Sequence, residues 1–240
     1  MYLEDEKTVF TTLCVGDQHY KDILATQLQS ILKFTHHEVY VVTDTPECFD
    51  NYYGSRVHFL RLSDLTDLPL KGKQGMFNFN LKMIPIKWVI ENVRPALTIY
   101  MDCDTFLFGW DRLFYRFFPQ DQEGIWGRFR HRLNDSDSHK LILDKLKLMN
   151  IDATNINTRL PIENVMFFKN GPTISRFFEE WYRLAKMSYD VGARTDFEAV
   201  EMCLAIHNTG LPYHHLDNKD PYVDNFRTFH HGKCHIPFVI

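Results

Sequence analysis

The sequence predicts a single α/β domain with a mostly parallel central sheet flanked by helices. Segments with strand-like and helix-like patterns alternate along the chain, which is typical of an open sheet covered by helices. The strand-like segments are short uninterrupted apolar runs, as expected of parallel strands buried on both faces. With 240 residues, of which 45% are hydrophobic and 15% aromatic, the chain can bury a sizeable core. We expect one domain over residues 1–240.

The first half of the chain predicts repeated β-then-α units. A β-branched, apolar run predicts a strand at residues 8–15, Gly16 and Asp17 interrupt it, and apolar residues then recur at helical spacing over residues 23–32. Three further runs predict strands at residues 39–43, 57–60 and 96–101. A helical pattern covers residues 77–93, within which Pro85 must start, kink or end a segment.

The second half continues the alternation less regularly. It predicts strands at residues 124–129 and 165–168, and helices at residues 141–149, 174–187 and 197–206. In open, mostly parallel sheets, ligands bind beyond the carboxyl ends of the strands. Asp102 falls just past the end of the strand predicted at residues 96–101, so a site is expected there.

Asp102 and Asp104 form an Asp-x-Asp motif directly after that apolar strand. Two carboxylates separated by one residue can reach one divalent cation, and oxygen ligands suit Mg²⁺ or Mn²⁺. Such a cation would neutralise the charge that builds on a nucleotide diphosphate leaving group. Acidic pairs at strand ends are also common solvated turn formers, but the preceding strand favours the metal site.

Three stretches around this motif resemble glycosyltransferase family 8, the glycogenin-like and bacterial galactosyl- and glucosyltransferase-like enzymes. They are the helical stretch from Leu81 and Lys82 to Trp88, the Asp-x-Asp strand at residues 98–108, and its continuation from Trp110 to Phe114. The resemblance implies a GT-A fold, a single Rossmann-like domain. Residues 1–108 would be the nucleotide-sugar-binding half, and residues 109–240 the acceptor-side half with a closing C-terminal segment.

The resemblance also implies a chemistry. The donor would be a UDP-hexose or UDP-pentose, the cofactor Mn²⁺ or Mg²⁺, and the sugar would pass with retention to an acceptor hydroxyl. The residues that it implies as donor contacts are Thr11, Thr12, Asp17, Tyr20, Lys82, Asp102, Cys103 and Lys233. Two of these have a structural alternative: Asp17 can cap the following helix, and Lys82 can be a solvated lysine on a helix.

Two downstream positions are similar to catalytic positions of the family. Asn164 begins an apolar run and is a candidate for contacting sugar hydroxyls. Asp196 stands where the family has an Asp-Gln pair near the reacting sugar, although Phe197 replaces the Gln. Thr195 and Glu198 also fit a capping box that opens the helix predicted at residues 197–206.

A His-His-Gly-Lys segment near the C-terminus is similar to the family's closing segment. In that interpretation His230 or His231 completes the metal shell and Lys233 holds the diphosphate. Adjacent histidines also occur in exposed tails, and His36–His37 and His214–His215 are pairs without an evident role.

Arg128, Arg130 and Arg132 follow Trp126 and could hold a phosphate-bearing or nucleic-acid acceptor through charge and stacking. We favour the alternative of a solvated edge strand, because the formal net charge of the chain is −4 and provides no general basic field. The acceptor stays open among a glycan, a protein side chain and a modified nucleobase.

Two other functions are weighed. Asp102 with Asp104 and Thr105 also fits the nucleophile motif of a haloacid-dehalogenase-type phosphohydrolase, but those enzymes carry it on their first strand. A non-catalytic sugar-nucleotide-binding module would have no need of the acidic pair.

Cellular location is an expectation from two patterns. The five cysteines are scattered without a Cys-x-x-Cys pair, and the sequence has neither a signal-peptide pattern nor an apolar run long enough for a membrane span. We therefore expect a cytoplasmic protein without a membrane span.

Overall fold

The computed structural model describes residues 7–49, 53–110, 118–119, 122–133, 140–195, 197–216 and 226–228. Its strands are β1 Thr8–Cys14, β2 Glu38–Thr43, β3 Val57–Arg61, β4 Leu97–Met101, β5 Thr105–Leu107, β6 Gly124–Arg132, β7 Arg159–Lys169, β8 Tyr213–His215 and β9 Phe226–Thr228. Its α-helices are α1 Gln18–Phe34, α2 Met83–Asn92, α3 Lys140–Leu148, α4 Pro172–Asp190 and α5 Glu198–Thr209. Short 3₁₀ turns are η2 Pro46–Phe49, η3 Gly54–Arg56, η4 Leu62–Asp64 and η5 Phe79–Lys82.

Most strands belong to one seven-stranded sheet with the order β3-β2-β1-β4-β7-β6-β8. The neighbours from β3 to β4 are parallel, and β8 is parallel to β6. Among the described strands of this sheet, only β7 runs against both of its neighbours. The predicted α/β fold with a mostly parallel sheet is therefore confirmed, with one reversed strand that the sequence pattern did not reveal.

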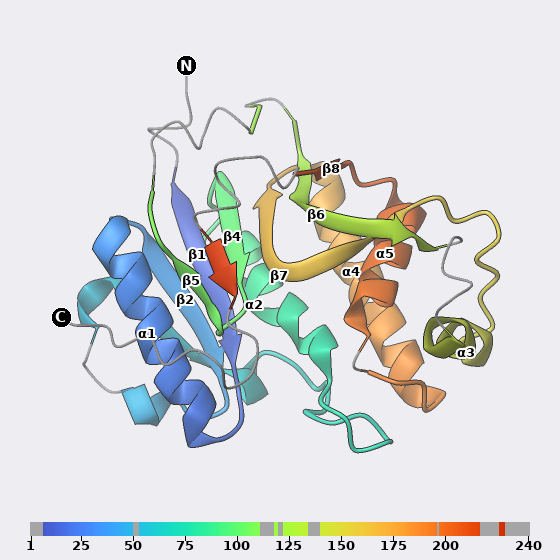
Figure 1. Ribbon diagram of the computed structural model, residues 1–240, viewed down its shortest axis with the longest axis horizontal. Coiled ribbons are helices and arrows are strands. Elements are labelled where there is room, and N and C mark those ends of the chain that lie inside the picture. The colour runs from blue at the N-terminus through green and yellow to red at the C-terminus, as the bar shows by residue number, and fades with distance from the viewer. Residues whose placement is uncertain are drawn as a thin grey trace.

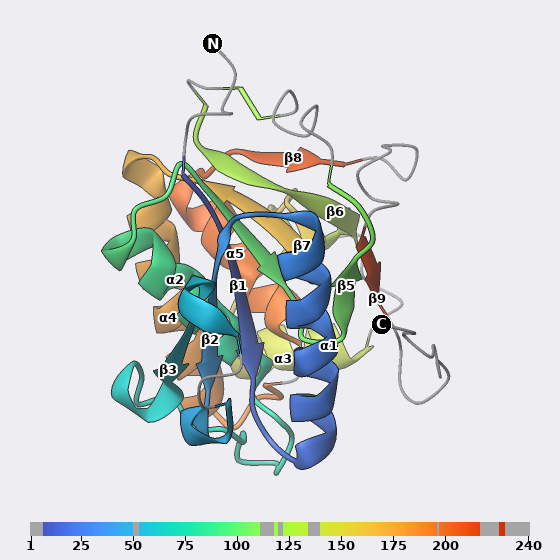
Figure 2. The ribbon, with the colours of Figure 1, turned by 90° about the vertical axis from the view of Figure 1, so that its left-hand side faces the viewer.

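Helices cover both faces of this sheet (Figures 1 and 2). On one face lie α1 and the small β5–β9 sheet, over a core that includes Phe10, Leu28 and Ile99. On the other face lie α2, α4 and α5, over a core that includes Tyr100 and Trp181. The two cores explain why the parallel strands read as continuous apolar runs.

Helix α1 begins where the sequence predicts. The side chain of Asp17 accepts a hydrogen bond from the backbone N–H of His19 at 3.1 Å, so it is the N-cap of the helix. Gly16, just before it, has a φ of 111°, a conformation that side chains with a Cβ rarely adopt. The alternative that Asp17 caps the following helix is thus confirmed. Contact between Asp17 and a donor stays a prediction.

The helical pattern over residues 77–93 divides into η5 and α2. Pro85 lies in the first turn of α2, where a backbone N–H has no partner inside the helix and its loss costs little. The break between the two segments leaves Lys82 at the junction, directly before α2.

Strand β4 is buried along its whole length, because it lies between the two cores. Leu97, Ile99 and Met101 contact the core under α1, whereas Tyr100 faces the core under α4. This alternation places Asp102 at the end of the strand, where the chain leaves the sheet.

Candidate active site

The carboxyl ends of β1 and β4 are neighbours at the point where the strand order reverses. The chain goes from β1 to β2 and β3 on one side, and then returns to β4 on the other side of β1. A reversal of this kind opens a crevice at the carboxyl ends of the two strands. Asp17 follows β1 and Asp102 follows β4, so the structure brings both predicted positions to this edge.

The carboxylate of Asp102 is held by two side chains. The hydroxyl of Tyr100 donates to its Oδ1 at 2.8 Å, and Nζ of Lys82 lies 3.1 Å from its Oδ2. The backbone N–H of Asp102 donates to the carbonyl of Asn164 at 2.8 Å. The side chain of Asp102 retains 22% of its exposure, so it is oriented and still reachable from solvent.

Lys82 is buried, with 8% of its surface exposed, and it bridges two carboxylates. Besides Asp102, its Nζ lies 2.8 Å from Oε1 of Glu198, the first residue of α5. The interpretation of Lys82 as a solvated lysine is wrong, because the side chain is buried and its ammonium group contacts the carboxylates of Asp102 and Glu198. Contact between Lys82 and a donor stays a prediction.

The capping box predicted at Thr195 and Glu198 is also wrong. The N-cap of α5 is Phe197, which makes no side-chain capping bond, and the hydroxyl of Thr195 donates to the carbonyl of Phe77 at 3.3 Å. Glu198 pairs with Lys82 instead of reaching back to the chain before the helix. The ion pair prevails because the ammonium group of Lys82 is buried and needs a counter-charge, which Glu198 supplies.

Gln27 is a site residue that the sequence prediction missed. It is fully buried on α1, and its Nε2 donates to the carbonyls of Asp102 at 2.6 Å and Thr105 at 2.8 Å. The side chain of Gln27 therefore links helix α1 to the backbone at both ends of the Asp-x-Asp turn. A signal existed in the sequence: Gln27 interrupts the apolar helical stripe that contains Leu24, Leu28 and Ile31.

The hydroxyl of Tyr20 lies near the acidic groups of the Asp-x-Asp turn. Burial, followed by the nearby Cys103, Asp17 and Asp104, raises the pKa of its hydroxyl above the ordinary value. Three other predicted positions, Cys103, Asp17 and Asp104, therefore lie close enough to Tyr20 to affect its hydroxyl. Tyr20 keeps 37% of its surface exposed at this place.

Cys103 lies between the two aspartates. A hydrogen bond with Cys14 and burial raise the pKa of Cys103 well above its ordinary value. This direction favours the neutral thiol in the protein alone, and contact of Cys103 with a donor stays a prediction.

Thr11 and Thr12 lie inside β1, and each is 1% exposed. The hydroxyl of Thr11 donates to the carbonyl of Tyr40 at 3.0 Å, so it ties β1 to β2. Contact of these two side chains with a nucleotide stays a prediction.

A hard divalent cation fits the donor atoms of the acidic turn. Asp102 and Asp104 supply carboxylate oxygens, and each Asp102 oxygen can accept a further bond besides the one it already makes. Within the described part of the chain, no group of three or more His, Cys, Asp or Glu side chains could hold a metal. The other predicted residues, Asp196, His230, His231 and Lys233, lie outside the described residues.

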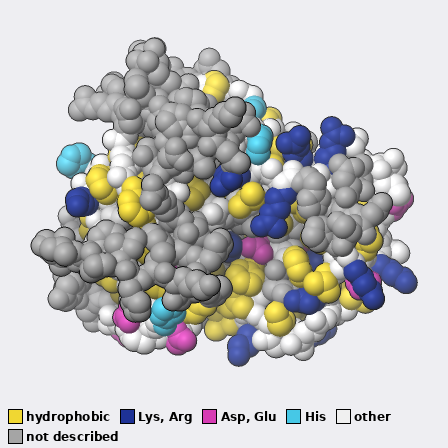
Figure 3. Space-filling model, viewed as in Figure 1, with side chains coloured by type: hydrophobic (Ala, Val, Ile, Leu, Met, Phe, Trp, Pro, Cys, Tyr) yellow, Lys and Arg dark blue, Asp and Glu magenta, His cyan; other side chains and the backbone are white. Residues whose placement is uncertain are grey.

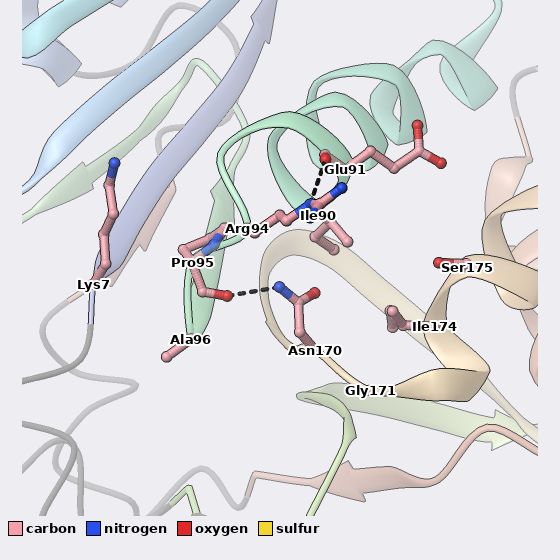
Figure 4. Close-up of a pocket in the computed structure, with 10 residues that line it drawn as sticks. All are labelled: Lys7, Ile90, Glu91, Arg94, Pro95, Ala96, Asn170, Gly171, Ile174 and Ser175. Atoms are coloured by element: carbon pink, nitrogen blue, oxygen red, sulfur yellow. Dashed lines mark hydrogen bonds between the residues drawn. The ribbon is translucent and has the colours of Figure 1, made fainter.

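A large open hollow of about 780 Å³ lies at the opposite edge of the sheet (Figure 4). It opens beside the starts of β1 and β4 and the first turn of α4, and Lys7, Arg94 and Asn170 are among its lining residues. Asn170 donates to the carbonyl of Pro95 at 2.6 Å. None of the predicted site residues that the structure describes lines this hollow, so its size does not make it the candidate active site.

The fold has a solved counterpart. The galactosyltransferase LgtC, solved in complex with donor and acceptor sugar analogues, superposes with a TM-score of 0.51 over 85% of this chain and 72% of its own, at 10% identity. The chain has the fold of a GT-A glycosyltransferase. This GT-A fold confirms the architecture that the family 8 resemblance implied. No family model and no curated protein matches the sequence. In the described part of the chain, every helix is too short or too polar to cross a membrane.

Proposed function

We propose that this protein is a metal-dependent glycosyltransferase that moves a sugar from a nucleotide diphosphate sugar to an acceptor hydroxyl. The observation that carries the proposal is the position of Asp102 and Asp104 in a GT-A fold. The pair follows β4 at the reversal of strand order, where Lys82, Tyr100 and Gln27 fix the geometry of Asp102 and its turn.

In the proposed reaction, the bond between the anomeric carbon and the diphosphate oxygen breaks, and the nucleoside diphosphate leaves with the electron pair. The acceptor oxygen bonds to the anomeric carbon, and its proton passes to an oxygen of the departing diphosphate. A Mn²⁺ or Mg²⁺ ion bound by Asp102 and Asp104 would offset the charge of the leaving diphosphate. Asp102 can serve this role because its carboxylate is already oriented before a ligand arrives.

Finer parts of the proposal follow the family 8 resemblance. We propose UDP-hexose or UDP-pentose as donor, retention at the anomeric carbon, and Asp196 and Asn164 as residues that contact the reacting sugar. His230 or His231 would complete the metal shell, and Lys233 would hold the diphosphate. Asn164 is supported by its place beside the site, because its carbonyl accepts from the backbone of Asp102. A cytoplasmic location also stays a prediction.

The test measures hydrolysis of a panel of UDP- and GDP-sugars, with Mn²⁺ or with a chelator, for the unaltered protein and two variants. Asp102→Asn and Asp104→Asn keep the side-chain shape and remove a charged ligand, so each is expected to lower turnover by about 100-fold or more. Asp64→Asn is the matched control, since Asp64 is exposed on η4.

The outcomes separate the three functions. Metal-dependent hydrolysis that disappears in both variants but not in the control supports the transferase. Release of phosphate from a simple phosphomonoester, lost in Asp102→Asn, would instead support the phosphohydrolase. Binding of a UDP-sugar without any turnover would support the non-catalytic module.

A further inference from the structure

Lys82 contacts a carboxylate that is also proposed to bind a divalent cation. Its Nζ lies 3.1 Å from Oδ2 of Asp102, while the hydroxyl of Tyr100 donates to Oδ1 of the same side chain at 2.8 Å. An ammonium group and a divalent cation repel each other when they share one carboxylate, because both are positively charged. The affinity of Asp102 for a cation therefore depends on where the ammonium group of Lys82 is held.

Glu198 gives that ammonium group a second position. Its Oε1 lies 2.8 Å from Nζ of Lys82, closer than the Asp102 oxygen, and the side chain of Glu198 is 7% exposed. Glu198 is the first residue of α5, where the helix dipole favours a negative charge. The ring of Phe79 adds a further contact, with its centroid 5.2 Å from Nζ of Lys82. The ammonium group thus has two favourable contacts that do not involve Asp102.

The backbone around Lys82 is anchored to the core. Lys82 ends η5, and η5 is tied to α4 because Nε1 of Trp181 donates to Oδ1 of Asn80 at 2.9 Å. Both Trp181 and Asn80 are fully buried. With its backbone held in this way, Lys82 divides the contacts of its side chain between the carboxylates of Asp102 and Glu198.

Glu198 does not join the acidic pair as a third metal ligand. Asp102, Asp104 and Glu198 all belong to the described residues, and among those residues no cluster of three or more His, Cys, Asp or Glu could hold a metal. On the face shown in Figure 3, the Asp and Glu side chains that are described are scattered and do not gather into an acidic patch. Contact with Lys82 is therefore the direct way in which Glu198 can affect a cation at Asp102.

We propose that Glu198 is a positioning residue, which holds the ammonium group of Lys82 and so leaves Asp102 able to bind a divalent cation. The proposal rests on the metal-dependent transferase function proposed above, and it names a residue that sets the metal affinity of the same site. Without the Glu198 carboxylate, Lys82 would pair with Asp102 alone and would oppose the cation more strongly. Without Lys82, Glu198 should have little effect on the cation.

The test measures Mn²⁺ binding by the protein alone, without donor or acceptor, from the electron paramagnetic resonance signal of free Mn²⁺. Glu198→Gln is expected to bind Mn²⁺ about tenfold more weakly than the unaltered protein, whereas Lys82→Met is expected to bind it at least as tightly. Adding Glu198→Gln to Lys82→Met is expected to change the affinity by less than about twofold. Direct attraction between Glu198 and the cation would instead give the same loss in both backgrounds.

The ion pair between Lys87 and Glu91 on α2 provides a matched control. Glu91 lines the hollow at the opposite edge of the sheet, so Glu91→Gln, Lys87→Met and their combination remove the same charges away from Asp102. Each control variant is expected to bind Mn²⁺ within about twofold of the unaltered protein, because solvent and salt screen charges at that separation.

Circular dichroism verifies that each variant is folded. If Glu198→Gln alone is unstable, comparison of Lys82→Met with the double variant still decides, because the double variant buries neither charge of the pair. Equal Mn²⁺ affinity of Glu198→Gln and the unaltered protein would overturn the proposal. The same loss in both backgrounds, or no Mn²⁺ binding by any form of the protein, would overturn it as well. Because this assay needs no turnover, it can succeed while donor hydrolysis fails, and the reverse.

Discussion

A buried ion pair joins α3 to α5, and its removal gives the sharpest test of how the second half of the molecule is stabilised. Nζ of Lys145 lies 2.7 Å from Oε1 of Glu201, and both side chains are 0% exposed. The same ammonium donates to the carbonyl of Phe197 at 3.0 Å, directly before the first turn of α5. Glu198, in that turn, pairs with Lys82 of the candidate active site.

Replacing one partner leaves a buried charge without a counter-charge. Lys145→Met keeps the length of the side chain and removes its charge, so the carboxyl group of Glu201 would lose its counter-charge in an apolar core. The expected loss is about 3–5 kcal/mol of unfolding free energy. At about 2–4 °C per kcal/mol for a chain of this size, Tm should fall by roughly 6–20 °C.

Replacing both partners should restore most of this stability. In the double variant Lys145→Met, Glu201→Leu, no charge is buried, and similar apolar volume fills the space. Its unfolding free energy is expected within about 1–2 kcal/mol of the unaltered protein, since apolar replacements of buried pairs are often neutral. The remaining loss would come mainly from the Phe197 carbonyl, which loses its donor.

Urea unfolding followed by far-ultraviolet circular dichroism measures all three proteins and Glu201→Leu, which completes a double-mutant cycle. A matched exposed change, Lys147→Met on the same helix, should alter stability by less than about 0.5 kcal/mol. A loss below 1 kcal/mol for Lys145→Met would refute the reasoning. A double variant as unstable as the single one would also refute it, because the unpaired charge would then not be the cause.

Two further predictions concern a half-buried histidine and a buried glutamine. Burial, followed by His36 and Arg56, lowers the pKa of His37 to about 4, so the unfolded chain binds a proton that the folded protein does not. Above about pH 6.5 the imidazole costs no stability, because it is neutral in the folded and the unfolded chain. As pH falls toward 4, proton binding favours the unfolded chain. Between pH 7 and 4.5, His37→Phe should therefore lose about 1–2 kcal/mol less unfolding free energy than the unaltered protein. Urea titrations at both pH values measure it, with exposed His207→Phe as control; parallel acid losses in all three proteins would contradict the prediction. Gln27→Leu removes a donor to two carbonyls of the Asp-x-Asp turn and should cost about 1–3 kcal/mol, whereas Gln29→Leu, exposed on the same helix, should not; equal urea midpoints would contradict this role.

The location of the candidate site was predictable because it depends on local patterns. The uninterrupted apolar run before Asp102 marks a buried strand, and its end marks the edge of the sheet where ligands bind. Asp17 was predictable for the same reason, since a helix N-cap follows from neighbouring residues.

The partners of Asp102 were not predictable in this way. Tyr100 occupies an ordinary core position of its strand. Its role becomes visible in the structure, where its hydroxyl donates a hydrogen bond to the carboxylate of Asp102. Lys82 and Glu198 meet because α5 packs beside η5, which is a property of tertiary structure and not of either local sequence. Gln27 is intermediate, because a polar residue in an apolar stripe predicts burial with a partner but does not say which one.

The direction of β7 was hidden as well. A buried strand reads as the same apolar run whichever way it points, so the alternation of strands and helices cannot distinguish a parallel neighbour of β4 from an antiparallel one.

The length of β7 has a consequence for how the molecule could change during evolution. Arg159, its first residue, and Asn164, whose carbonyl accepts the backbone N–H of Asp102, belong to one strand. The spacing between the two is therefore set within the strand, which includes the register shift opposite Gly127 and Arg128, and insertions in the surrounding loops leave it unchanged. A single-residue deletion within the strand would turn every following side chain to the other face, whereas lengthening the chain before Arg159 would leave this spacing unchanged.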